Sequence, residues 1–275
     1  MWKLAVITLT IFQTLETAHP QEKVHMGLTS SDNVHFVVTD PSGRRAGRDP
    51  RGAASRAEGI EIGGIPNAHY AFESVGDIPD SNETPNPIYY HEFAYTFGSP
   101  QGDGLYKIEM IGIESSRFDF YISVDPASGS ARQRCRFVLK GAVIEQDSML
   151  TYHLLYNGAL DTPIHFKKIA LPSTLRQDLS AAYKLNLLGD KKLFDELNNQ
   201  LDKFERTLTK GKEDSVKARK ELEEFEKKID KEREETTKHE QRGQKDKRFL
   251  AADAYEILKE DISLLRRQFP DKQGR

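Results

Sequence analysis

The sequence is poor in the features that would supply disulfides, a membrane span or a strong electrostatic field. It has one cysteine, Cys135, so no intrachain disulfide can form and packing must hold the fold together. Its formal net charge is only -3, from 40 Lys and Arg against 43 Asp and Glu. Because such a mixed surface attracts phosphates weakly, we expect no nucleic acid among its partners. The apolar runs are shorter than the about 20 residues of a spanning helix, so we expect no transmembrane anchor.

Motifs of catalytic chemistry are also missing. The sequence has no Gly-x-Ser-x-Gly, no glycine-rich phosphate loop and no Cys-x-x-Cys. His91-Glu92 lacks the second histidine, four residues on, that a zinc-binding helix needs. Other histidines stand singly and are expected on strand surfaces or half-buried, among them His35, His69, His153 and His165. We therefore expect no catalytic, cofactor-binding or metal-binding residues and no enzyme. The less favoured alternative is an unfamiliar active site that uses Asp77, His91 or Glu92.

The N-terminus has the order of features of a signal peptide. Lys3 precedes an apolar run, Leu4–Phe12, and Ala18 follows as a small residue at which a signal peptidase could cut. We predict a signal peptide over residues 1–18, and a secreted, periplasmic or cell-surface location. An exported protein without disulfides is commoner in bacteria than in animals. A buried N-terminal strand or helix is the alternative, and Glu16 fits the cleavage rule poorly.

From about residue 24 to residue 171 the apolar residues recur at every second position, in short runs between Gly, Pro, Asp and Ser. Tyr106, Ile108 and Met110 share one face, with Lys107 and Glu109 on the other. A hairpin partner follows at 118–124, and further strands are expected at Val34–Thr39, His69–Phe72, Ile88–Phe97, Arg134–Glu145, Met149–Tyr156 and Ile164–Ile169. Seven or eight short strands predict an antiparallel β-sandwich domain, residues 24–171. Cys135 alternates in phase with Phe137, which predicts a buried thiol.

Two loops of this domain contain candidate ligand contacts. Residues 43–64 do not alternate, so we expect an exposed loop in which Arg44, Arg45 and Arg48 could clamp an anion or a polysaccharide carboxylate. The alternative is that these arginines pair with Asp40 or Asp49. A second loop contains the oxygen-bearing side chains Asp77, Asp80 and Glu83. We expect a polar turn there, with calcium as the alternative, because calcium takes such ligands from one turn.

After Pro172 the apolar residues fall three and four positions apart, which predicts amphipathic helices. We predict a helical bundle domain over residues 172–275, with three main helices and a short leading helix at Leu175–Leu188. Its core should contain Leu201, Phe204, Leu222, Phe225, Leu258 and Ile262. Residues Asp230–Arg248 lack large apolar side chains, so we expect a solvated helix extension and a turn at Gly243. A partner-binding arm is the alternative.

Both halves contain motifs that resemble known modules. VVTDPSGRRAG at Val37–Gly47, GIPNAHYAFES at Gly64–Ser74 and GDGLYKIEMIG at Gly102–Gly112 resemble β-sandwich modules of large exported bacterial proteins. Residues 175–265 are similar to the FIMAH-type helical domain that is appended to secreted bacterial hydrolases and surface proteins. The resemblance implies accessory or adhesion-type units without assigned catalysis. Here the polar 230–248 segment departs from the helical pattern.

These observations favour an exported, non-catalytic binding or structural module. We expect the sandwich loops and the charged helices to contact a protein or polysaccharide of the cell surface or envelope. The alternative is an accessory subunit or remnant of a secreted hydrolase.

Overall fold

A computed structural model describes residues 23–31, 33–55, 58–75, 88–98, 103–126, 135–156, 165–209, 215–243 and 247–269. Within these residues eleven strands precede four helices, so the predicted order of β structure followed by α structure is confirmed. The strands are β1 (Lys23–Ser31), β2 (Val34–Thr39), β3 (Arg45–Asp49), β4 (Ile60–Gly63), β5 (Ala68–Val75), β6 (Ile88–Gly98), β7 (Gly104–Gly112), β8 (Ser116–Pro126), β9 (Cys135–Ile144), β10 (Met149–Tyr156) and β11 (His165–Lys168).

The strands form two antiparallel sheets. One sheet has the order β5-β6-β1-β8-β9, and the other has the order β11-β10-β7-β2-β3-β4. Alternate side chains from both sheets meet in one hydrophobic core, in which Phe36 of β2 contacts Phe120 of β8 edge to face, with ring centroids 5.5 Å apart. The alternation of apolar residues in the sequence correctly predicted which side chains face the core, because successive residues of a strand point to opposite faces of the sheet.

The expected count of seven or eight strands was too low. β3 and β4 lie inside residues 43–64, which were expected to form a loop, and β1 lies before the first expected strand. β3 and β4 have only five and four residues, and β3 contains a single apolar side chain, Ala46, so the apolar pattern is too short to identify them. Backbone pairing between Ala46–Asp49 and Ile60–Gly63 holds the two strands together. Gly47 has φ 134°, and a Cβ there would lie 2.2 Å from the Phe36 carbonyl oxygen, so only glycine fits this close approach.

The helical half has four helices within the described residues: α1 (Pro172–Lys184), α2 (Lys191–Thr209), α3 (Ser215–Gln241) and α4 (Ala252–Arg267). The sequence predicted three main helices and a short leading helix. The leading helix, α1, is a full member of the bundle, because its Leu175, Leu179 and Ala182 lie in the same core as the side chains of the other three helices. The six predicted core residues all lie in this core and are at most 1% exposed, which confirms that prediction. None of the described helices is long and apolar enough to cross a membrane.

The polar segment 230–248 is only partly solvated. α3 continues to Gln241 and a turn follows at Gly243, as expected. However, Glu232 and Thr236 are buried, each 5% exposed. The Glu232 carboxylate accepts hydrogen bonds from Arg248, at 2.9 and 2.5 Å, and the Thr236 hydroxyl accepts one from the Leu250 amide at 2.9 Å. Polar side chains here fasten α3 to the segment that leads into α4, a role that hydrophobic periodicity does not reveal.

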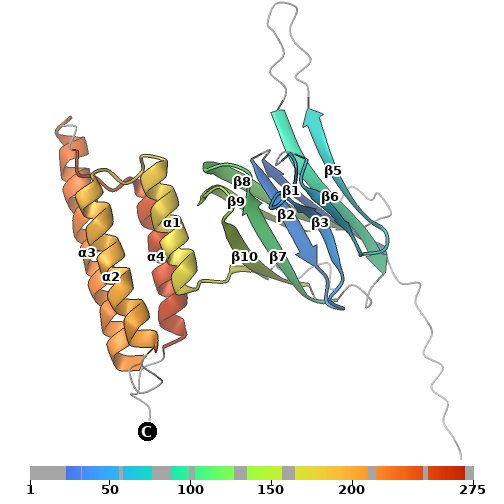
Figure 1. Cartoon of the computed structure of the whole chain (residues 1–275). Helices are drawn as coiled ribbons and strands as arrows, with labels where there is room; N and C mark the ends of the chain where they lie inside the picture. The colour runs from blue at the N-terminus through green and yellow to red at the C-terminus, as the bar shows by residue number, and fades with distance from the viewer. Residues whose placement is uncertain are drawn as a thin grey trace, which may run out of the picture.

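The helices stand to one side of the two sheets, with α1 and α4 nearer to the strands than α2 and α3 (Figure 1). The join contains a buried charge cluster, in which Lys168 of β11 meets Asp178 of α1 and Asp261 of α4. The Lys168 ammonium nitrogen lies 2.6 Å from Asp261 Oδ1 and donates a hydrogen bond to Asp178 Oδ2. We call these three residues the buried triad. A further pair, Arg117 with Asp253 at 2.6 Å, spans the same join at the surface.

Burial and charge act in opposite directions on the buried triad. Burial alone would lower the pKa of Lys168, but the two neighbouring carboxylates raise it above its usual value. Burial raises the pKa of Asp261 well above its usual value, and the negative charge of Asp178 raises it further. One ammonium cannot balance two buried carboxylates, so the fold favours a protonated Asp261.

Candidate functional site

Two of the three candidate arginines serve the structure of their own hairpin. Arg44 pairs with Asp40 at 2.7 Å, and Asp40 Oδ1 also accepts the Arg44 and Ser42 backbone N–H groups. Burial of Asp40 opposes ionisation, but these hydrogen bonds lower its pKa below the usual value. Arg48 donates to the Glu58 carbonyl oxygen at 2.6 Å. The pairing alternative is thus correct for Arg44, whereas Arg48 ties the β3–β4 connection together.

Arg45 is the candidate arginine that faces outward from a sheet. It lies on β3 with its side chain 45% exposed and pairs with Glu109 of β7 at 3.1 Å, and not with Asp40 or Asp49. Lys107 of β7 pairs with the same carboxylate at 2.6 Å and is 44% exposed. The assignment of Lys107 and Glu109 to the outward face is confirmed, since Tyr106, Ile108 and Met110 all lie in the core.

The strand register places these cations in one row across five strands of the six-stranded sheet. From β11 to β3 the paired residues are Lys167, His153, Lys107, Thr39 and Arg45. Because neighbouring strands lie about 4.8 Å apart, Lys167 and Lys107 stand about 10 Å apart along this row. Lys167 is exposed, and neither Lys167 nor His153 has a hydrogen-bond or ion-pair partner among the described residues.

Two leucines lie beside this row on the same face. Leu105 of β7 and Leu155 of β10 are direct cross-strand partners, and they are 50% and 47% exposed. Paired residues on one face of a sheet have neighbouring side chains, so the two leucines form one apolar patch. We call Leu105, Leu155, Lys107, His153, Lys167 and Arg45 together the basic face. Its permanent cations are Arg45, Lys107 and Lys167, and the carboxylates of Glu109 and Asp49 lie on the same side of the sheet, Asp49 in an ion pair with Arg51.

The basic face stands out against its own half of the chain, because residues 21–171 contain 14 Lys and Arg against 19 Asp and Glu. A local excess of positive charge on an acidic background directs an acidic partner to one side of the molecule. Its apolar patch bordered by charged side chains has the composition of a protein interface, with an apolar centre and a polar rim.

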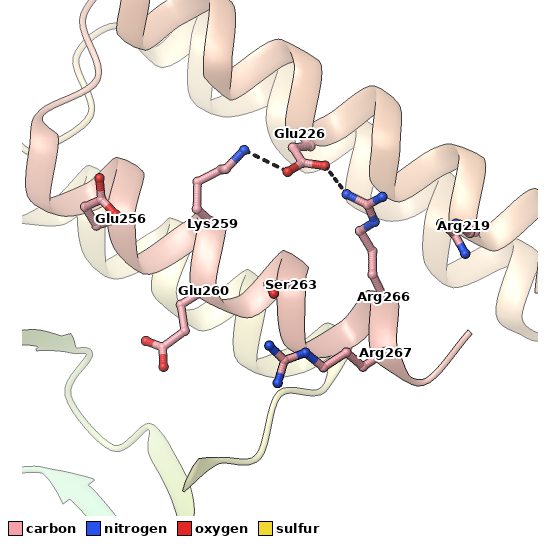
Figure 2. A pocket seen from close by; sticks show the side chains of 8 residues that line it. All are labelled: Arg219, Glu226, Glu256, Lys259, Glu260, Ser263, Arg266 and Arg267. Carbon is pink, nitrogen blue, oxygen red and sulfur yellow. Dashed lines mark hydrogen bonds and ion pairs between the residues drawn. The ribbon is translucent and has the colours of Figure 1, made fainter. Parts of the chain in front are cut away.

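A hollow of about 780 Å³ lies between α3 and α4. It is lined by Arg219, Glu226, Glu256, Lys259, Glu260, Ser263, Arg266 and Arg267. Figure 2 shows that Glu226 of α3 receives both Lys259 and Arg266 of α4, at 2.7 and 2.6 Å. Burial would lower the pKa of Lys259, but its hydrogen bonds to carboxylates outweigh burial and raise it. The central charges of this hollow pair with one another and join the two helices.

The other candidate residues contribute no site to the described structure. Asp77, Asp80 and Glu83 lie outside the described residues, as does the predicted signal peptide, residues 1–18. Cys135 lies in β9, paired with Val124, and His91 and Glu92 lie in the strand β6. His35 was expected at a surface or half-buried but is fully buried, with its Nδ1 3.1 Å from the Tyr70 hydroxyl. The described residues contain no group of three or more side chains suited to a metal ion.

Sequence reasoning identified Arg45 but missed the rest of the basic face. The signal was present, since Leu105 and Lys107 alternate with core residues on β7, as His153 and Leu155 do on β10. What could not be foreseen was the order β11-β10-β7-β2-β3, which brings those outward positions into one row.

No model in a scan of protein families matches the chain, and no curated protein matches it in a sequence search.

Proposed function

We propose that this protein is an exported, non-catalytic binding module that holds an acidic polypeptide partner of the cell surface or envelope on its basic face. In this proposal the first domain is a β-sandwich that displays the binding surface, and the helical domain is a rigid support beside it. The observation that carries the proposal is the row of Lys167, His153, Lys107 and Arg45 alongside the exposed pair Leu105 and Leu155.

A polypeptide partner suits both parts of the basic face. Acidic side chains would pair with Lys167 and Lys107, while an apolar side chain would cover the two leucines. Partners that bind in this way associate faster at low salt, because exposed charges are screened within about 10 Å at 0.1 M salt. The signal-peptide pattern and the resemblance to exported bacterial modules support an extracytoplasmic setting, and the lack of a nucleophile-base motif in the sequence supports a binding role.

Site-specific photocrosslinking in the native envelope tests the proposal. A benzophenone amino acid replaces Leu155 in one protein and Val216 of α3 in another, because Val216 is equally exposed, at 51%, but lies on the helices. We expect a crosslinked protein from position 155 and none from position 216. The same product should weaken in the variant Lys107→Gln/Lys167→Gln and persist in the charge-matched variant Lys203→Gln/Lys220→Gln, whose lysines are exposed on α2 and α3.

Equal products from positions 155 and 216, or no effect of the Lys107→Gln/Lys167→Gln change, would refute the basic face as the binding surface. A product that is lost when polygalacturonate is added, together with direct binding of that polymer, would assign the face to an acidic polysaccharide instead. A captured hydrolase would favour the accessory-subunit alternative that the FIMAH-type resemblance implies.

A further inference from the structure

Two histidines lie on the outward face of the six-stranded sheet, since the core-facing residues next to them are Tyr152, Leu154 and Phe166. His153 of β10 is partly exposed and His165 of β11 is exposed. The strand register pairs His153 directly with Lys107 on one side and with Lys167 on the other. His165 pairs with Leu155, so it stands diagonally across from His153. Diagonal neighbours on one face of a sheet lie about 7–8 Å apart, so the two imidazoles share one patch with the two lysines.

The carboxylate that faces His153 across the register is already engaged. Glu109 of β7 is diagonal to His153, because Glu109 pairs with Thr151. Its Oε1 lies 2.6 Å from Lys107 and its Oε2 lies 3.1 Å from Arg45. Neither His153 nor His165 makes a hydrogen bond or an ion pair with a described residue.

The other outward neighbours of the two histidines are either cationic or uncharged. On β10 they are Thr151 and Leu155, on β7 they are Leu105 and Lys107, and on β11 the outward residue beside His165 is Lys167. Within the described part of the chain, the charged groups that face the imidazoles are therefore two ammonium groups and the paired Glu109. A carboxylate brought by a partner would be the first available counter-charge for either imidazole.

Protonation of both histidines would add two cations to the three permanent ones of the basic face. Imidazole is the side chain that changes its charge between about pH 8 and pH 5. A carboxylate of a bound partner stabilises the imidazolium over the neutral imidazole, so partner and protons bind together. The sign follows from this linkage: the added affinity is present at pH values below the ordinary histidine range, about 6.5, and is lost as the pH rises above it.

We propose that His153 and His165 make binding on the basic face pH-dependent, so that the acidic polypeptide partner is held more tightly in an acidic medium than in a neutral or alkaline one. This inference rests on the proposed function and adds the regulation of the same surface. The observation that carries it is the position of His153 between Lys107 and Lys167, with His165 beside it on the same face.

Fluorescence anisotropy of the full chain at constant low salt, with a rhodamine-labelled peptide of four Glu-Glu-Leu repeats, tests the proposal. Glutamates titrate near about 4.3, so between pH 5.5 and pH 8 the peptide keeps its charge while histidines change theirs. We expect a Kd about tenfold lower at pH 5.5 than at pH 8, because each of two added exposed ion pairs contributes about threefold. A peptide of Gln-Gln-Leu repeats should show no such difference.

Three variants then assign the pH dependence. His153→Gln/His165→Gln should reduce the tenfold ratio of the two Kd values to about twofold or less. His153→Lys/His165→Lys should bind at pH 8 about as tightly as the unchanged protein does at pH 5.5, because ammonium groups keep their charge over this range. His69→Gln, which changes an exposed histidine of β5 in the other sheet, should keep the tenfold ratio.

A tenfold ratio that survives in His153→Gln/His165→Gln would overturn the inference, and so would equal binding of the acidic peptide by the unchanged protein at both pH values. Either result would leave the proposed function standing, provided that Lys107→Gln/Lys167→Gln weakens binding at both pH values. Failure of the acidic peptide to bind at either pH would instead contradict the basic face as a binding surface, and the inference with it.

Discussion

Replacing Lys168 by methionine should destabilise the protein strongly, since it leaves the buried carboxylate of Asp178 without its cation, beside a protonated Asp261. Lys168, Asp178 and Asp261 have side chains that are 4%, 1% and 0% exposed, so water cannot take over the role of the ammonium. Breaking a buried ion pair by removal of one partner costs about 3–5 kcal/mol. Since whole domains are stable by only about 5–15 kcal/mol, this loss is a large part of the stability.

The neighbouring residue provides a matched control. Lys167 precedes Lys168 on β11 but points outward, so Lys167→Met removes the same charge from an exposed position and should change stability by no more than about 0.5 kcal/mol. Urea unfolding followed by circular dichroism at 222 nm reports the helices that carry Asp178 and Asp261. A combined Lys168→Met/Asp178→Leu/Asp261→Leu variant should recover most of the loss, because a packed apolar core of similar volume is often as stable as buried charges.

Equal urea midpoints for Lys168→Met and Lys167→Met would refute this expectation. The ammonium would then not be compensating the carboxylates, and the join between sheets and helices would rest on apolar packing alone. A combined variant less stable than Lys168→Met would contradict the expectation in a different way, since it would show that the carboxylates stabilise the join without a cation.

Three further outcomes follow from burial and charge. The raised pKa of Asp261 keeps this residue protonated in the folded state above pH 3.8, where the unfolded chain has lost the proton. The free energy of unfolding should therefore fall as the pH rises from about 4 through the folded pKa. Asp261→Asn should remove this pH dependence in urea titrations at several pH values. Hydrogen bonds from Arg248 and Lys228 lower the pKa of Glu196 to about 2, so its stabilising contribution should be lost as the pH falls from about 4.5 to 2, and Glu196→Gln should flatten that part of the profile. Phe225→Ala should cost about 3–5 kcal/mol because Phe225 is 1% exposed in the helical core, whereas changes at the exposed pair Glu234 and Lys238 should cost at most about 0.5 kcal/mol; a neutral Phe225→Ala in thermal melts would place that side chain outside the core.

The helical core was readable from the sequence because a helix repeats within a few residues. Side chains three and four positions apart share a face whatever the rest of the chain does, so periodicity alone assigned Leu201, Phe204, Leu222 and Phe225 to one core. The same local logic assigned Tyr106, Ile108 and Met110 to the inside of a strand and Lys107 to the outside.

What local periodicity does not contain is which strands become neighbours. The basic face exists because β11, β10, β7, β2 and β3 pair in that order, with a register that aligns Lys167, His153, Lys107 and Arg45. A shift of one residue in any pairing would send an outward side chain inward, so this surface is a property of long-range backbone pairing.

The buried triad shows the same division between local pattern and tertiary structure. Lys168, Asp178 and Asp261 each occupy a position that a sequence rich in Lys and Asp would assign to solvent. They are buried where α1 and α4 meet β11, and their charges are tolerable there only because they meet one another. The sequence alone determined the two periodicities and the side of each element that is apolar. The tertiary structure decided which polar side chains meet, because those contacts join residues as distant along the chain as Lys168 and Asp261, beyond the reach of any local repeat.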